Sequence, residues 1–139
     1  MNRKTNTTRS EAIDPLSAAF DDEFLDIDPW PQAWRVEPQD LAPGQLMLDI
    51  FKVFLLHQLS LRRARKTLRL HRKHLFTLGG QLIRRLHEHA SLRKRGIVRV
   101  LAESIDDDGG PIVYPPLTAS EQRSFDTTCS LLHRFMLLG

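Results

Sequence analysis

Basic side chains gather in one segment of the sequence, at a spacing that suits contact with phosphate groups. The segment 59–80 reads LSLRRARKTLRLHRKHLFTLGG and contains no Asp or Glu. DNA carries about one charge per 1.7 Å of its axis, so a cationic helix face contacts several phosphates at once. Arginine, which binds phosphate or guanine through paired hydrogen bonds, outnumbers lysine here. The candidate nucleic-acid-binding residues are the cations of this segment: Arg62, Arg63, Arg65, Lys66, Arg69, Arg72 and Lys73.

A helical wheel separates these cations from the leucines. Short steps along the chain place five of them in a stripe beside the leucine seam: Arg62, Arg65, Arg69, Arg72 and Lys73. A second basic group is expected to extend the same surface: Arg84, Arg85, Arg93, Lys94 and Arg95. Like charges at helical spacing destabilise an isolated helix, which favours an anionic partner. The alternative interpretation is a solvated face, or one that is paired within the chain.

Acidic residues are concentrated before the basic segment. Residues 11–40 contain nine acidic side chains and one base, whereas residues 60–99 contain thirteen bases and one acid. We call residues 16–40 the acidic leader, which also carries Trp30 and Trp34. One hypothesis is that the leader folds back over the basic stripe, with both tryptophans held in an apolar groove. The alternative is that both tryptophans belong to the core and the acids are simply exposed.

Metal-binding and catalytic patterns are weak in this sequence. Cys129 and His133 have the spacing of two metal ligands on one helix face, but Cys129 also falls on an apolar stripe. The histidines at 71 and 74 lie among basic residues, which disfavour a dication. The acidic triplet 106–108 lacks the distal glutamate of a calcium loop. We therefore expect a core cysteine, a solvent loop, no metal or other cofactor, and no enzymatic activity.

Apolar periodicity predicts the helices that carry these residues. The segment 44–59 is apolar on almost every side, which is typical of the central helix of a bundle. Ser60 is then the expected N-cap of a second helix that begins at Leu61. The leucine spacing over 61–86 predicts one long helix. A turn near 69–71 would instead give two helices at an angle.

Local signals define the rest of the chain. The glycine pair 79–80 inside a helical pattern indicates close approach of a neighbouring helix. A serine-capped short helix is expected over 92–103, followed by a loop over 105–116. Thr118 and Glu121 have the spacing of a capping box and predict the start of the last helix.

Composition places the chain among small globular proteins. A length of 139 residues with 41% apolar residues predicts one domain. A lone cysteine, the lack of a membrane-spanning apolar run and the lack of a signal peptide together predict a cytoplasmic protein that does not enter a membrane. The expected fold is all-α, a bundle of four to five helices at 41–139. It is preceded by a disordered tail at 1–15 and by the acidic leader.

Two DNA-binding families resemble parts of this sequence. The apolar positions of the bacterial helix-turn-helix are matched by Ala64, Leu68, Leu70, Leu75 and Leu78. In that alignment 61–68 is the first helix and 72–80 is the recognition helix. The segment 51–79 is similar to the helical core-binding domain of tyrosine recombinases, although the catalytic half of that family is absent. Both resemblances imply DNA binding without strand cleavage.

The sequence therefore predicts a small DNA-binding protein, either a bacterial-type transcriptional regulator or an accessory factor of a mobile element. RNA is a second candidate ligand, and the leucine seam is a candidate homodimer contact. The alternative is a protein-interaction module, such as an adaptor, an antitoxin or an inhibitor, that uses the basic helix and the tryptophans of the leader.

Overall fold

The computed structural model describes residues 15–138, and this part of the chain is all-α, as the sequence predicts. Its helices are α2 (Pro15–Phe24), α3 (Trp30–Trp34), α4 (Leu41–Ser60), α5 (Arg65–Glu88), α6 (Ile97–Ser104) and α7 (Ala119–Leu138). Three short 3-10 helices join them: η1 (Leu25–Ile27), η2 (Pro38–Asp40) and η3 (Ala90–Arg95). Apart from Pro15, the tail expected at 1–15 lies outside the described residues.

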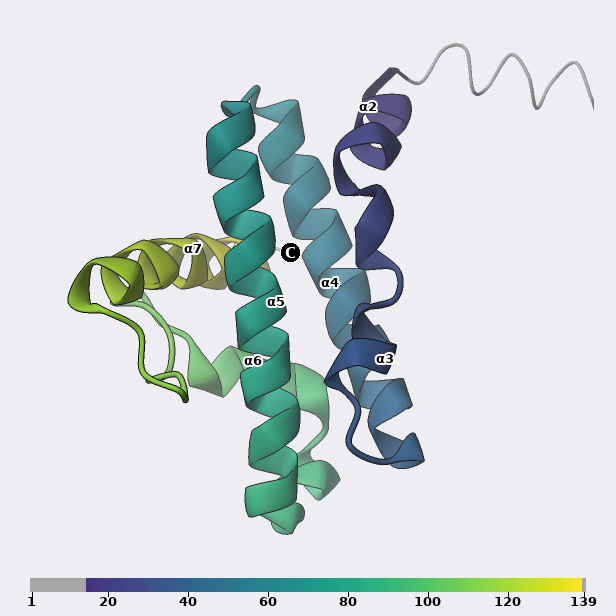
Figure 1. Cartoon of the computed structure of the whole chain (residues 1–139), viewed down its shortest axis with the longest axis vertical. Helices are drawn as coiled ribbons and strands as arrows, with labels where there is room; N and C mark the ends of the chain where they lie inside the picture. Colours follow the sequence, from purple (N-terminus) through teal and green to yellow (C-terminus); the bar gives the residue numbers. More distant parts are fainter. Residues whose placement is uncertain (1–14, 139) are drawn as a thin grey trace, which may run out of the picture.

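Two long helices form the centre of the molecule. Figure 1 shows α4 and α5 side by side, joined at one end by a short turn, so that they run antiparallel. The acidic leader, which contains α2 and α3, lies along α4 on the side away from α7. On the other side α7 crosses α5, and α6 lies below it (Figure 1). The fold is therefore an antiparallel helical hairpin covered on both sides.

Helix α5 is continuous from Arg65 to Glu88, which confirms the single-helix interpretation of this segment. Its buried face carries most of the predicted leucine seam, with Leu68, Leu75 and Leu82 at most 2% exposed. The turn near 69–71 that the two-helix interpretation requires is absent. No glycine, proline or asparagine occurs there to end a helix, and the leucine seam keeps its helical spacing through the segment.

Helix α5 begins at Arg65, four residues later than the expected start at Leu61. Ser60 is not an N-cap: it is the last residue of α4, and its hydroxyl donates to the His57 carbonyl oxygen at 2.6 Å. Arg62 then adopts a left-handed conformation, with φ of 59°, and its N–H donates to the Leu59 carbonyl oxygen. Leu61 is 46% exposed because it belongs to the α4–α5 turn and not to the core seam.

The acidic leader is built into the core. Trp30 and Trp34 are 8% and 7% exposed, and the Trp34 indole N–H donates to the Phe76 carbonyl oxygen at 2.9 Å. A Cβ atom at Gly79 would lie 2.2 Å from the Trp34 ring, so only glycine lets the indole pack at this position. The glycine pair thus marks a close approach, as predicted, but the approaching group is an indole of the leader and not a neighbouring helix.

The C-terminal part of the chain agrees with the sequence except at one helix. The helix expected over 92–103 is divided, because Gly96 adopts a φ of 83° between η3 and α6. The loop expected over 105–116 is observed. The capping box is confirmed, since the Thr118 N–H donates to Glu121 Oε1 at 3.0 Å and the Glu121 N–H donates to Thr118 Oγ1 at 3.1 Å.

Candidate nucleic-acid interface

The exposed cations at the start of α5 form the most concentrated basic surface among the predicted site residues. We call this surface the cationic corner, and its residues are all exposed: Arg62, Arg63, Arg65, Lys66, Arg69 and Lys73. The first two lie in the α4–α5 turn, so the continuous helical stripe expected from the wheel does not begin until Arg65. The sequence has no Asp or Glu between Asp49 and Glu88. The cationic corner thus lies within a long acid-free segment of the sequence.

The backbone adds positive potential to the cationic corner. The N-cap of α5 is Ala64, which provides no side-chain hydrogen bond, and the first turn contains no acidic residue. The first N–H groups of a helix lack partners within the helix and form the positive end of its dipole. Each cation placed there is unfavourable by about 0.3–1 kcal/mol. A bound anion would satisfy the N–H groups and remove this repulsion.

Arg62 adds a conformational cost at the same place. A residue with a Cβ atom is destabilised by roughly 1–2 kcal/mol in the left-handed region. Strained backbone of this kind is concentrated at functional sites. The turn therefore presents an arginine side chain where a glycine would be more stable.

Arg72 of the predicted stripe contacts the acidic leader. Arg72 Nη1 lies 2.8 Å from Asp26 Oδ1, and on α4 the Lys52 Nζ lies 2.6 Å from Asp28 Oδ1. The two carboxylates are 70% and 73% exposed, so each ion pair contributes at most about 1 kcal/mol. The leader does fold against the basic helix, but Arg72 is directed to the leader and is not part of the cationic corner.

The second predicted basic group does not extend this surface. Its residues lie at the opposite end of α5 and in η3: Arg84, Arg85, Arg93, Lys94 and Arg95. Arg65 and Arg84 are separated by about 28 Å along the helix, at 1.5 Å per residue. Acids also neutralise this end, because Arg84 pairs with Glu88 and Arg95 pairs with Glu103. Arg84 also lies 4.4 Å above the ring of Tyr114.

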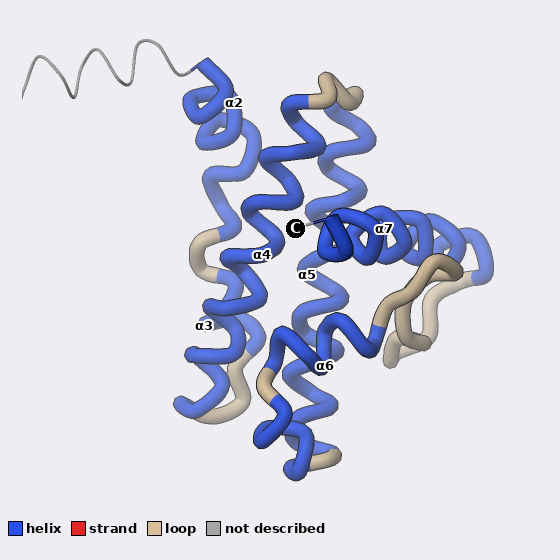
Figure 2. Tube along the Cα trace, turned by 180° about the vertical axis from the view of Figure 1, so that it is seen from behind, coloured by secondary structure: helices blue, strands red, loops and turns tan. Residues whose placement is uncertain are grey.

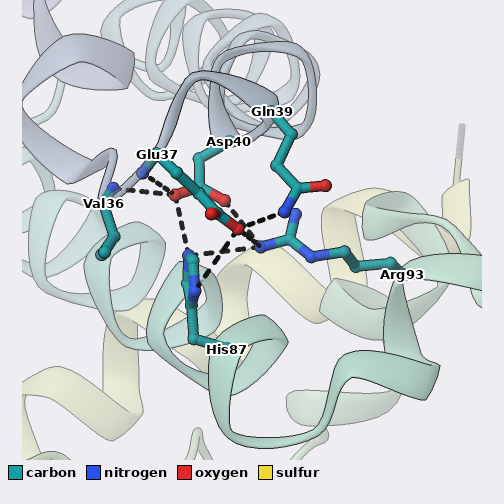
Figure 3. A network of polar contacts seen from close by, with 6 residues as sticks. All are labelled: Val36, Glu37, Gln39, Asp40, His87 and Arg93. Atoms are coloured by element: carbon teal, nitrogen blue, oxygen red, sulfur yellow. Dashed lines mark hydrogen bonds and ion pairs between the residues drawn. The ribbon is translucent and has the colours of Figure 1, made fainter.

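Arg93 belongs to a partly buried polar cluster, centred on Asp40, that sequence reasoning missed (Figure 3). Asp40 is 0% exposed; its Oδ1 accepts a hydrogen bond from Arg93 at 2.7 Å, and its Oδ2 lies 2.8 Å from His87 Nε2. The Val36 and Glu37 N–H groups donate to the same Oδ2. Burial alone would raise the pKa of Asp40, but the hydrogen bonds from Glu37, Arg93, His87 and Val36 lower it well below its usual range.

This cluster is a structural clasp. Glu37, Asp40 and His87 place three possible metal-ligand atoms within 4.8 Å of one another. The Arg93 guanidinium already supplies the positive charge that a cation would provide, and both Asp40 oxygens have partners. The clasp therefore ties the end of the leader to α5 and η3. Its sequence signal is the capping box of η2, in which Glu37 and Asp40 cap one another.

Two histidines on the inner side of α5 are buried. His71 Nδ1 and His74 Nδ1 lie 2.8 and 2.7 Å from the same Thr128 hydroxyl oxygen. One hydroxyl has one proton, so Thr128 donates to one imidazole and accepts from the other. Burial lowers the pKa of both histidines. The pKa of His71 falls to about 4, and the charges of His74 and Arg63 add to the effect of burial. The pKa of His74 is lowered by burial and by the charge of Lys73.

These buried groups are packed in the core of the fold. His71 Nε2 lacks a hydrogen-bond partner among the described residues, and the rings of Phe54 and Phe125 pack edge-on against the two imidazoles. The expected core cysteine is observed, since Cys129 is 0% exposed. Burial, together with the charge of Asp126, raises the pKa of its thiol, so the unreactive protonated form is favoured.

Comparisons of this chain with protein-family models, with curated proteins and with solved structures gave no match. Within residues 15–138, no helix is both long enough and apolar enough to cross a membrane.

Proposed function

We propose that this protein binds nucleic acid, and DNA in particular, through the cationic corner. The observation that carries the proposal is the set of six exposed cations around the uncapped N-terminus of α5, in a segment without acidic residues. Repulsion among these cations and with the helix dipole is relieved when phosphates lie against them.

The fold supports contact with the phosphate backbone more than insertion of a recognition helix. Helices α4 and α5 are antiparallel, and the cations lie at the closed end of their hairpin (Figure 1). Phosphate contacts position a protein on a duplex, whereas base contacts specify the sequence. Single-stranded RNA binding usually requires exposed aromatic rings for stacking. Phe76 is the sole aromatic residue between Ser60 and Arg99; it is 40% exposed and one side of its ring packs against Trp30 and Trp34, so this segment offers no row of rings for successive bases. Duplex DNA is therefore the favoured ligand.

Within this proposal the protein acts in the cytoplasm as a small regulator or as an accessory factor of a mobile element. The continuous α5 does not fit the helix-turn-helix alignment, so the resemblance to the core-binding domain is the one that agrees with this proposal. The acidic leader then limits the extent of the basic surface, because Asp26 neutralises Arg72 beside the cationic corner.

The test is a titration of a labelled duplex at several salt concentrations. Three corner cations are reversed together, Arg62→Glu, Lys66→Glu and Lys73→Glu. The matched control reverses three cations of the opposite end, Lys94→Glu, Arg95→Glu and Arg99→Glu, and so changes the net charge equally. If each corner cation neutralises one phosphate, the slope of log affinity against log salt falls by about 3 in the corner variant.

The control variant separates a local interface from general attraction by net charge. It is expected to keep most of the salt dependence of the unmodified chain. Equal losses in both variants, or binding that does not depend on salt, would contradict the proposal. An absence of nucleic-acid binding together with capture of an acidic protein would favour the interaction-module alternative.

A further inference from the structure

The outer face of α4 exposes a row of mostly apolar residues along its whole length. Six exposed positions recur at spacings of four and three residues: Ala42, Leu46, Asp49, Val53, Leu56 and Ser60. We call this row the outer seam. Leu46, Val53 and Leu56 are 50%, 56% and 36% exposed, and Asp49 is the single charged residue of the row.

A helix that is apolar on all sides is normally covered on all sides. The inner face of α4 meets this expectation, since Met47, Phe51 and Phe54 are 0% exposed. In Figure 2, α4 runs between α2 and α3 on one side and α6 and α7 on the other. The flanks of α4 are therefore occupied, while the outer seam between them remains exposed.

We propose that a second copy of this chain covers the outer seam, with α4 of each copy packed antiparallel against α4 of the other. Alternating spacings of four and three residues are those of a coiled-coil seam, in which each side chain enters a gap between residues of the facing helix. The row is also symmetric about position 51. A two-fold axis there places Leu46 opposite Leu56 of the partner subunit, and Ala42 opposite Ser60 of the partner subunit.

Charge selects the antiparallel arrangement. In a parallel pair, Asp49 would face Asp49 of the partner subunit within an apolar seam, where like charges repel strongly. The antiparallel pair places Asp49 opposite Val53 of the partner subunit. It also moves the two cationic corners to opposite ends of the dimer, whereas a parallel pair would bring them together.

A cavity beside Leu46 provides room for a side chain from the other copy. Its volume is about 310 Å³, and its apolar walls come from Ala42, Pro43, Leu46, Leu86 and Ile97. Gln39 and Arg93 form its polar side. The two-fold axis brings Leu56 of the partner subunit to this position, so the seam has both a projecting leucine and a space that receives one.

Sedimentation equilibrium of the full chain tests the association. The unmodified chain is expected to dimerise, and Leu46→Glu and Val53→Glu are each expected to make it monomeric without changing its circular dichroism. The matched controls are Val36→Glu and Ile112→Glu, which alter residues that are 71% and 76% exposed and lie outside α4. Both controls are expected to remain dimeric. A monomeric unmodified chain, or dimers that survive both α4 substitutions, would overturn the proposal.

Oxidative cross-linking tests the orientation. A variant with both Leu46→Cys and Leu56→Cys is expected to form a disulfide-linked dimer, because these positions face one another only in the antiparallel pair. Each single substitution is expected to cross-link poorly. Efficient cross-linking by either single variant would instead show a parallel pair and would overturn the arrangement. Cys129 is buried and does not compete in this reaction.

Discussion

The two ends of α5 contain the same kinds of side chain but differ in what surrounds them. At the C-terminal end, Arg93 pairs with the buried Asp40, and Arg95 pairs with Glu103. At the N-terminal end the exposed cations lie within an acid-free segment and near an uncapped helix terminus. A basic run therefore does not by itself define an interface: at one end its arginines pair with acidic side chains nearby in the fold, and at the other its cations are exposed at the surface.

The largest effect is expected at the C-terminal end of α5. Arg93→Ala leaves Asp40 buried without its guanidinium partner, which should lower the free energy of unfolding by about 3–5 kcal/mol. Lys66→Ala at the other end should change it by no more than about 0.5 kcal/mol. Urea denaturation measures both, with Arg95→Ala as the control for an exposed ion pair. If Arg93→Ala and Lys66→Ala unfold alike, the difference between the two ends is not structural.

The contributions of His71 and Asp40 to stability should be lost in different pH ranges. The pKa of His71 in the fold is about 4, below the usual histidine value of 6.5, so His71 is neutral at neutral pH. The stability that comes from keeping it neutral is lost as pH falls from 6.5 to 4. The loss is on the order of 3 kcal/mol. The pKa of Asp40 is lowered, so its contribution to stability is complete above the usual aspartate value of 3.8 and is lost only below that pH. Urea midpoints from neutral to acid pH should therefore fall in two stages.

Removal of His71 should reduce the first stage of this pH profile. His71→Gln is expected to make the fall between pH 6.5 and 4 shallower, because this range is set by the unfolded and folded pKa values of His71. Burial also lowers the pKa of His74, so part of the fall should remain. A profile that keeps its full slope in this variant would contradict the contribution of His71.

Between the two ends, the two neighbouring glycines should respond oppositely to alanine. Gly79→Ala places a Cβ atom 2.2 Å from the Trp34 ring, and the overpacking should cost about 1–3 kcal/mol. At Gly80 the nearest indole atom is 3.4 Å from the added Cβ, so Gly80→Ala should instead gain part of the roughly 1 kcal/mol of helix propensity. Thermal unfolding of the two variants checks this order. Equal destabilisation would show that the indole does not fix this part of α5.

The smallest effect is expected at the cationic corner. Arg62→Gly should stabilise the fold by up to about 1 kcal/mol, because glycine adopts a positive φ without strain. The same change removes one phosphate contact, so the slope of log affinity against log salt should fall by about 1. Greater stability with weaker binding would support a functional reason for the arginine. A stability loss would mean that the side chain has a structural role in the turn.

Much of the fold follows from local patterns in the sequence. Thr118 with Glu121 predicts the start of α7. Leucine spacing predicts a helix in the α5 segment, but it leaves one long helix and two helices at an angle as alternatives, and the structure shows the single helix. The register of the α4–α5 turn does not follow, because Ser60 and Leu61 suit the end of one helix as well as the start of the next. The split at Gly96 is also missed, since a glycine inside an apolar pattern is compatible with a weakened helix.

The candidate site is harder to predict from the sequence, because residues that are distant in the sequence determine whether each charged side chain is paired or exposed. Arg93 looks like part of a basic surface until Asp40, 53 residues earlier, is placed beside it. His71 and His74 depend likewise on a hydroxyl more than fifty residues away in the sequence. The cations at 62–66 are easier to assign, since exposure at a helix terminus follows from the local turn.

The packing around the Trp34 ring suggests a way to control the stability of a variant of this protein with an added small molecule. Gly44, Gly79 and Gly80 surround its ring, and the Phe76 carbonyl oxygen marks the place of the indole nitrogen. Trp34→Gly should therefore leave an indole-shaped void and destabilise the fold by about 3–5 kcal/mol. Free indole added to the solution should occupy that void and restore stability in proportion to its concentration. In this variant the concentration of a small molecule would then determine whether the leader packs against α4 and α5.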